Sequence, residues 1–272
     1  MKQKFFTIAY MGALTILGGA SAHANGVLLT YAEDPGIQTS TLANTSHISF
    51  DSLPTGSSKN LSWNGVGTYD NAYILAANQY GGAGGTGKYI VQSTSLGGSN
   101  AVPTTTLTLN TPSAYFGLWW SAGDVANKLS FYNGASLVAS FTTASLVNVL
   151  PASYKGNPTP AFLGMDASEK FAFFNIYGEN GATWDSIVFT NAGSSGFESD
   201  NHTTRVAAWG QLPGETGPAP GVAFATVQGT TVAAVAAVPE TSTWMMGFLA
   251  LGAVVFMVRR KGFAPESRAS VR

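Results

Sequence analysis

The stretch KLSFYNGASLVASF, residues Lys128–Phe141, is the clearest structural signal in this chain. Two short runs rich in strand-forming residues, Lys128–Tyr132 and Ser136–Phe141, flank the dipeptide Asn133-Gly134. Asn-Gly supplies the positive φ angles that a tight hairpin turn requires. The stretch therefore predicts two antiparallel strands joined by a short turn.

The same pattern recurs further along the chain. Lys170–Tyr177 turns through Glu179–Gly181 into Thr183–Thr190, so we expect a second hairpin there. Its first strand should direct three aromatic side chains to one side, namely Phe171, Phe173 and Tyr177. Thr104–Thr111 alternates Thr with Leu, which is typical of an edge or half-buried strand.

These strands belong to a body, residues 25–212, in which no stretch is convincingly helical. Short strands and frequent Gly and Asn turns indicate an all-β fold, which we expect to be an antiparallel, jelly-roll-like β-sandwich. The body is long enough to bury the core of one domain. Residues 213–237 are rich in Pro, Gly and Ala, and we expect them to form a linker.

The composition fits an exported protein. The 272 residues include no cysteine, so neither a disulfide framework nor a thiolate metal site can form. Only 10% are charged and the net charge is −1, which argues against nucleic acid as a partner. The 32 glycines and many Ser, Thr and Asn residues indicate tight turns and an uncharged, hydrogen-bonding surface that suits a matrix of sugars.

The N-terminus has the three parts of a secretory signal peptide. Two lysines precede the short apolar run Phe5–Leu17, and small residues follow, with Ala22 and Ala24 in the small-x-small exit. Cleavage after Ala24 by signal peptidase would remove residues 1–24 and leave a mature chain that begins at Asn25.

The C-terminus carries the uncharged apolar run Trp244–Val258 and then the basic cluster Arg259–Lys261. Extended to residues 242–258, the run is just long enough for a single transmembrane helix, with the basic cluster on the cytoplasmic side. Residues 262–272 would then form a cytoplasmic tail.

Residues 238–261 resemble the PEP-CTERM sorting signal of bacteria that make exopolysaccharide. The matching residues are Val238, Pro239, Glu240, Ser242, Thr243, Arg259 and Arg260. Thr241 stands where the common pattern has proline. The resemblance implies that exosortase, a membrane enzyme, recognises the motif and removes the tail after export. Tails of this kind are also called ice-binding protein C-terminal domains, a name that describes the tail and no activity.

Parts of the body also look like segments of exosortase-dependent surface proteins. They are Phe116–Asp124, Ile187–Asn191 and Gly196–His202. This resemblance implies an extracellular β-domain and adds no mechanism.

Two groups of residues are candidate binding sites. Glu198, Asp200 and Asn201, with Asp124, could supply oxygen ligands to calcium, but their spacing lacks the EF-hand pattern, which favours a solvated loop. The adjacent Trp119 and Trp120 should point to opposite faces of a sheet. An exposed one could stack on a glycan ring; alternatively, both are packed in the interior.

Catalysis has little support in the sequence. The mature body has only two histidines, His47 and His202, and no Gly-x-Ser-x-Gly motif. A glycosidase needs only two carboxylates that converge. The available ones are Asp51, Asp70, Asp124, Asp166, Asp185 and Glu198.

We therefore expect an exported surface or matrix protein that is not an enzyme, needs no cofactor and has a structural or glycan-binding β-domain in an exopolysaccharide-rich envelope. The alternative is a secreted carbohydrate-active hydrolase. Ice binding rests on Thr104–Thr108 alone, whereas a flat ice-facing surface needs many stacked rows of Thr.

Overall fold

The computed structural model describes residues 26–147 and 149–228. The predicted signal peptide (1–24), its cleavage point, the sorting signal (238–261) and the transmembrane helix (242–258) lie outside the described residues. Within the described ranges, no helix combines the length and apolar character needed to cross a membrane.

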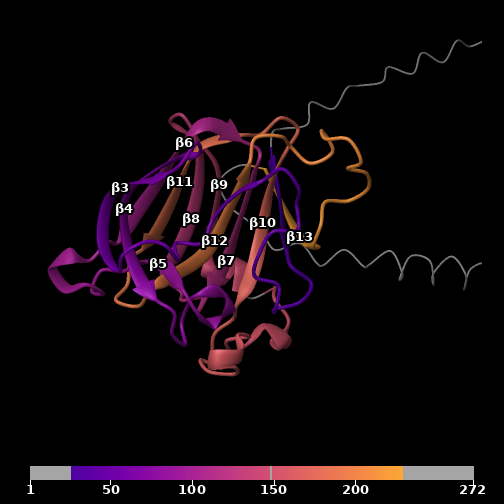
Figure 1. The fold of residues 1–272 in the computed structure, drawn as a ribbon. Coiled ribbons are helices and arrows are strands. Elements are labelled where there is room, and N and C mark those ends of the chain that lie inside the picture. Colours follow the sequence, from indigo (N-terminus) through magenta and orange to yellow (C-terminus); the bar gives the residue numbers. More distant parts are fainter. Residues whose placement is uncertain (1–25, 148, 229–272) are drawn as a thin grey trace, which may run out of the picture.

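Strands make up about half of the described chain and are its main secondary structure (Figure 1). The strands are β1 Gly26–Tyr31, β2 Ser46–Ile48, β3 Gly56–Trp63, β4 Gly67–Ala76, β5 Lys88–Gln92, β6 Thr104–Ser113, β7 Tyr115–Ser121, β8 Asn127–Asn133, β9 Ser136–Thr142, β10 Ala172–Glu179, β11 Trp184–Asn191, β12 Phe197–Arg205 and β13 Val222–Gln228. The helical segments are α1 Thr143–Val147 and the short 3-10 turns Ala83–Gly85, Gly98–Asn100, Ala152–Tyr154 and Pro160–Phe162.

The strands form one antiparallel sheet in the order β13-β1-β10-β7-β12-β5-β4-β6-β11-β8-β9, with β2 beside β12 and β3 beside β4. Strand β9, at one end of this path, approaches β1 near the other end. The sheet therefore curls around a common interior (Figure 1). The predicted all-β, antiparallel, sandwich-like domain is confirmed.

The hairpin expected within Lys128–Phe141 is present as β8 and β9. Its turn lies one residue later than expected, at Gly134 and Ala135, and of these two only Gly134 has a positive φ, 56°. One positive φ at the first turn position is typical of a type II′ turn. Asn133 stays in β8, where its Nδ2 donates a 3.1 Å hydrogen bond to the backbone oxygen of Thr183.

The second expected hairpin does not form, although both of its strands do. Strand β10 pairs with β1 and β7, whereas β11 pairs with β6 and β8. Asn180 and Gly181 do turn the chain, with φ angles of 53° and 84°. An Asn-Gly turn reverses the chain locally but does not determine which strand the returning segment pairs with, and here the two strands enter different parts of the sheet.

The strands β1, β10, β7 and β12 form a wall that is buried on both faces. Its inner face belongs to the main core, in which Trp120 packs with Phe174 and Phe197. On its outer face the chain has two smaller hydrophobic clusters, one at each end. The cluster at one end contains Trp119, Phe171 and Phe173, and the cluster at the other contains Tyr115 and Tyr177. The expected shared orientation of Phe171, Phe173 and Tyr177 is confirmed.

The predicted linker begins too early. Residues 222–228 form β13, which pairs with β1 along its whole length. The segment before it is attached to the wall, because Thr30 Oγ1 donates a 2.7 Å hydrogen bond to the backbone oxygen of Pro220. Pro and Gly favour extended chain, but they do not prevent a segment from packing across the end of a sheet. The described domain therefore runs to Gln228 rather than ending at Leu212.

Candidate functional site

Strand β12 positions most of the residues predicted to bind metal. Its register with β7 pairs Asp200 with Trp119, an outer-face residue, and Glu198 with Ser121. Because side chains alternate along a strand, Glu198 and Asp200 lie on the outer face of the wall. Asn201, with a φ of 50°, lies at a bulge that shifts this alternation.

Several carboxyl groups meet in one pocket, which we call the acid pocket. It encloses about 430 Å³. Its lining comes from four separate parts of the chain and consists of Leu75, Asn78, Tyr80, Tyr89, Leu96, Ala122, Asp124, Glu169, Ser194, Ser195, Gly196 and Glu198. No Lys or Arg of the described residues contributes to this lining.

Glu198 is the most buried acid of this pocket. It is 4% exposed, and its Oε2 atom has no hydrogen-bond partner within the described protein. Burial raises the pKa of Glu198 well above its ordinary value, and the negative charges of Asp124 and Glu169 raise it further. We therefore expect Glu198 to be protonated at neutral pH, when its carboxyl can both donate and accept hydrogen bonds.

Glu169 enters the pocket from the loop before β10. Burial, a hydrogen bond with Asp166 and the charges of Asp166 and Asp124 raise the pKa of Glu169 to about 8. One oxygen of each partner, Oε2 of Glu169 and Oδ2 of Asp166, is buried without a hydrogen-bond partner among the described residues. The acid pocket therefore holds protons at neutral pH and carries less negative charge than its composition indicates.

The rim of the acid pocket is partly aromatic. Tyr80 is 42% exposed there, whereas Tyr89 is buried. Asn78 links the two, because its Oδ1 accepts hydrogen bonds from the backbone N–H of Tyr80 at 2.8 Å and from the hydroxyl of Tyr89 at 3.2 Å. The loop that presents Tyr80 is thus attached to strand β5 through Tyr89.

The predicted calcium set is not brought together. Glu198 and Asp124 line the acid pocket. Asp200 instead accepts hydrogen bonds from the backbone N–H groups of Ala83 and Asn201, at 2.8 and 2.6 Å. Asn201 contacts His47, with its Oδ1 2.9 Å from Nε2. Across residues 26–147 and 149–228, no three His, Asp or Glu side chains are arranged to hold a metal ion.

Trp119 and Trp120 point to opposite faces of the wall, as expected, but neither is exposed. Trp119 is 0% and Trp120 2% exposed. The outer-face indole is covered because Phe171 and Phe173 pack against it. The interpretation of either residue as a glycan-stacking platform is therefore wrong, and the alternative, that both are packed in the interior, holds.

A Ser-His pair is present in the core. His202 Nε2 lies 2.9 Å from Ser199 Oγ, and His202 Nδ1 lies 2.9 Å from the hydroxyl of Tyr69. Burial lowers the pKa of His202 to about 3, and the charge of His47 lowers it further. Both members of the pair are 0% exposed, so a substrate in the solvent does not reach them in this structure.

The carboxylates considered for a hydrolase fall into two groups. Three of them meet at the acid pocket, where the charges of Asp124 and Asp166 help to raise the pKa of Glu198. The other three accept backbone hydrogen bonds elsewhere: Asp51 from Lys88, Asp70 from Thr106 and Asp185 from Gly134. Sequence reasoning missed Glu169, because no local motif connects it with Glu198.

Comparison with protein-family models, with curated proteins and with solved structures finds no match for this chain.

Proposed function

We propose that this chain is an exported surface or matrix protein whose β-domain binds an uncharged glycan without catalysis. Export and sorting are supported by the signal-peptide pattern of residues 1–24 and by the resemblance of residues 238–261 to an exosortase signal. Exosortase, the export machinery and envelope polysaccharide are the partners that this proposal implies. A jelly-roll-like arrangement within the curled sheet is part of it.

The acid pocket is the observation that carries the binding proposal. Glu198 Oε2 is buried, has no hydrogen-bond partner among the described residues and belongs to a pocket whose described lining includes no Lys or Arg. An unsatisfied buried carboxyl is costly unless a ligand completes its hydrogen bonds. A protonated carboxyl can donate one hydrogen bond and accept others, so it pairs well with a ligand group that does both. Sugar hydroxyls have this property.

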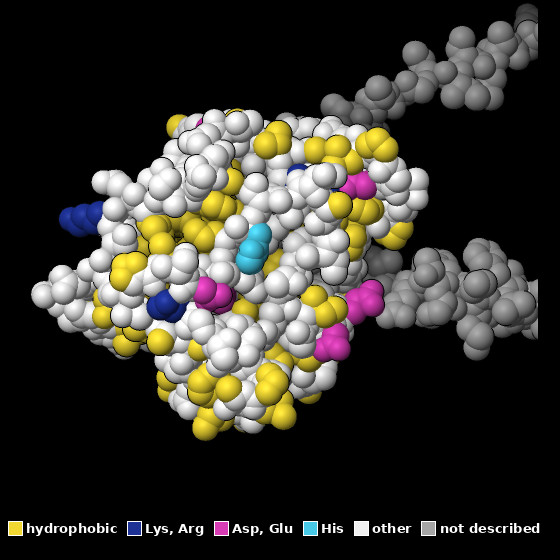
Figure 2. Space-filling view, viewed as in Figure 1, with side chains coloured by type: hydrophobic (Ala, Val, Ile, Leu, Met, Phe, Trp, Pro, Cys, Tyr) yellow, Lys and Arg dark blue, Asp and Glu magenta, His cyan; other side chains and the backbone are white. Residues whose placement is uncertain are grey.

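The rim adds the second element of a sugar site. Tyr80 exposes part of its ring at the pocket, and an aromatic face can pack against the apolar C–H face of a pyranose. On the face of the molecule shown in Figure 2, few side chains are charged. Few charged side chains on this face would therefore favour a charged ligand over a neutral glycan.

The test is an array of neutral and acidic oligosaccharides probed with the full chain at pH 6 and pH 9. We expect neutral glycans to bind at pH 6, Tyr80→Ala to remove the binding that the acid pocket contributes, and Glu198→Ala to weaken that contribution at least about tenfold. Glu198→Gln keeps a donor and an acceptor, so it should retain binding at both pH values. Glu33→Gln, an exposed site away from the acid pocket, is the matched control. A silent array with well-folded protein contradicts the proposal.

The second candidate function is a carbohydrate-active hydrolase, which the raised pKa values of Glu198 and Glu169 favour. A carboxyl whose pKa is raised by burial and by neighbouring carboxyl groups has the property that a general acid needs. A hydrolase releases new reducing ends from the same polysaccharide, and Glu198→Gln would then abolish turnover while preserving binding. If the wild type and Glu198→Gln both bind the polysaccharide and neither releases reducing ends, the non-catalytic proposal is supported.

A further inference from the structure

A second pocket lies at the opposite end of the outer face, and we call it the Trp209 pocket. It encloses about 440 Å³, and its lining includes Leu28, Tyr177, Glu179, Asn180, Trp209 and Gln211. Strand β10 connects the two pockets, because it begins just after Glu169 and ends at Glu179. At ~3.3 Å per residue, the pockets lie more than about 20 Å apart.

Trp209 differs from the other described tryptophans because it is only half-buried, whereas the others are buried. Its indole is held in place, since Nε1 donates a 3.1 Å hydrogen bond to the backbone oxygen of Gly217. The ring also meets Tyr177 edge-on, with centroids 6.5 Å apart at 66°. Part of a fixed aromatic surface is therefore open to this pocket.

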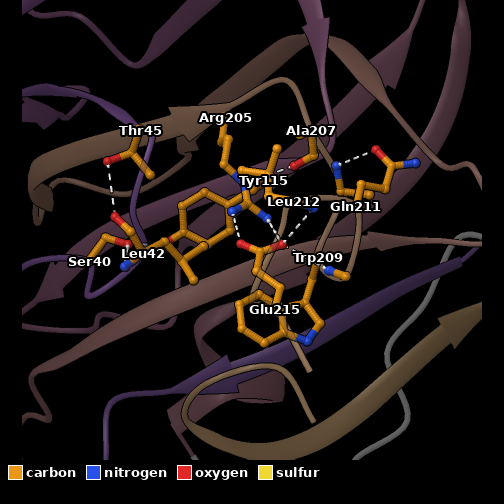
Figure 3. Close-up of polar contacts among 12 residues, drawn as sticks. Ser40, Leu42, Thr45, Tyr115, Arg205, Ala207, Trp209, Gln211, Leu212 and Glu215 are labelled. Carbon is orange, nitrogen blue, oxygen red and sulfur yellow. Dashed lines mark hydrogen bonds and ion pairs between the residues drawn. The ribbon is translucent and has the colours of Figure 1, made fainter. Parts of the chain in front are cut away.

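An ion pair organises the loop that carries Trp209 (Figure 3). The buried guanidinium of Arg205 pairs with the carboxylate of Glu215. Glu215 Oε2 also accepts hydrogen bonds from the backbone N–H groups of Gly210, at 3.0 Å, and Leu212, at 3.4 Å. These bonds close the loop on both sides of Trp209, so a ligand would meet a largely pre-formed surface.

The polar groups around Trp209 are amides and one carboxyl. Asn180 and Gln211 are exposed. Gln211 Oε1 accepts a 3.0 Å hydrogen bond from the backbone N–H of Ala208, which holds the side chain of this lining residue through its amide oxygen. Neither Lys nor Arg of the described chain lines this pocket. An aromatic face with amides beside it matches a neutral saccharide, which offers an apolar ring face and hydroxyls at its edge.

We propose that the Trp209 pocket is a second saccharide-binding site, so that one chain bridges two glycan strands from opposite ends of its β-wall. The second site stands on its own geometry, and the bridging rests on the proposed function of the acid pocket. Two sites on one rigid wall give a cross-link of fixed span, which increases the avidity for a polymer without any new contact.

To test this, the full chain is titrated with cellohexaose, maltohexaose and chitohexaose. Tryptophan emission reports binding near Trp209, and calorimetry gives the number of binding sites. We expect a saturable change of emission in the wild type and in Tyr80→Ala, and its loss in Trp209→Phe. Gln211→Ala should weaken the emission-linked binding about fivefold, the effect of one hydrogen bond. Two sites should be counted in the wild type and one in each of Tyr80→Ala and Trp209→Phe. Circular dichroism checks that each variant is folded.

The outcomes separate this inference from the proposed function. A single site that Tyr80→Ala removes and Trp209→Phe leaves unchanged overturns the second site but supports the acid pocket. A single site that only Trp209→Phe removes supports the Trp209 pocket and overturns both the acid pocket and the bridging. If two sites are found, bridging is tested by mixing the protein with a long polymer of the same sugar. We expect the mixture to become turbid with the wild type and to stay clear with either single-site variant. A clear mixture with the wild type overturns the bridging.

Discussion

At the scale of single residues, burial changes the meaning of the aromatic pair that the sequence offers as a glycan platform. Trp119 and Trp120 are both enclosed, and the Nε1 atom of each lacks a hydrogen-bond partner in the described protein. Their adjacency follows from the strand, in which consecutive side chains enter two different hydrophobic clusters. Both residues therefore stabilise the fold and do not contact ligand.

We expect Trp119→Ala and Trp120→Ala each to lower the free energy of unfolding by about 3–5 kcal/mol, because each leaves a large cavity. Phenylalanine at either position should cost clearly less, since it keeps most of the volume and removes a buried N–H without a partner. Urea denaturation of the variants measures both effects. Val125→Ala, at a site 87% exposed, is the control and should be near neutral. A cost below about 1 kcal/mol for both alanine variants would contradict the enclosed positions.

At the scale of elements, substitutions in the β8–β9 hairpin can test which residues form its turn. Gly134 has a positive φ of 56°, whereas Ala135 does not. We expect Gly134→Ala to cost about 1 kcal/mol of unfolding free energy, because alanine is disfavoured at positive φ. Ala135→Ser should change it by less than about 0.5 kcal/mol. Thermal unfolding of both variants checks the position of the turn, and the reverse order of costs would place it elsewhere.

The same elements show what sequence could and could not predict. Hydrophobic runs and Asn-Gly turns identified β8, β9, β10 and β11, since these signals act within a few residues. Pairing was predicted correctly only for β8 with β9. The partners of β10 lie far away along the chain, and no local signal specifies them. The acid pocket could not be predicted for the same reason, because Glu169 and Glu198 line one pocket through the pairing of strands that lie far apart along the chain.

At the scale of the whole molecule, both ends of the described chain lie at one end of the wall. Gly26 pairs with Gln228 of β13 and with Glu179 of β10. Glu179 lines the Trp209 pocket. The acid pocket lies at the far end of β10. The acid pocket and the two ends of the described chain therefore lie at opposite ends of the wall.

We predict two processed ends for the protein taken from its native envelope. Signal peptidase should leave Asn25 as the first residue, and exosortase should leave a C-terminus near Pro239–Thr243. Intact-mass spectrometry of the envelope and medium fractions measures both ends at once. A mature chain that still ends at Arg272 would show a single-pass membrane protein and would refute sorting by exosortase.

The buried acids predict an unusual dependence of stability on pH for the molecule as a whole. Burial raises the pKa of Asp200 to about 8, although the backbone N–H groups of Ala83 and Asn201 oppose this shift. The pKa of Glu169 is also about 8, and that of Glu198 is raised as well. The native chain thus retains protons that the unfolded chain releases above about pH 4.5. Stability from Glu169 and Asp200 is complete below that pH and is lost as the pH rises through about 8, and the raised pKa of Glu198 acts in the same direction.

His202 acts in the opposite direction and sets the acidic limit. The folded protein keeps it neutral to about pH 3, whereas the unfolded chain protonates it below about pH 6.5, so stability falls as the pH drops through this window. The carboxyl groups with a raised pKa, Glu169, Glu179, Glu198 and Asp200, outweigh one histidine. We therefore expect the highest Tm at about pH 5, with a steady fall towards pH 8. Thermal unfolding from pH 4 to pH 9 measures the profile.

Glu198→Gln should flatten the alkaline side of this profile, because glutamine has no proton to release, whereas Glu33→Gln should leave the profile unchanged. A Tm that rises between pH 5 and pH 8 in the wild type would mean that the acid pocket is ionised in the native protein, and a cation would then suit it better than a neutral sugar.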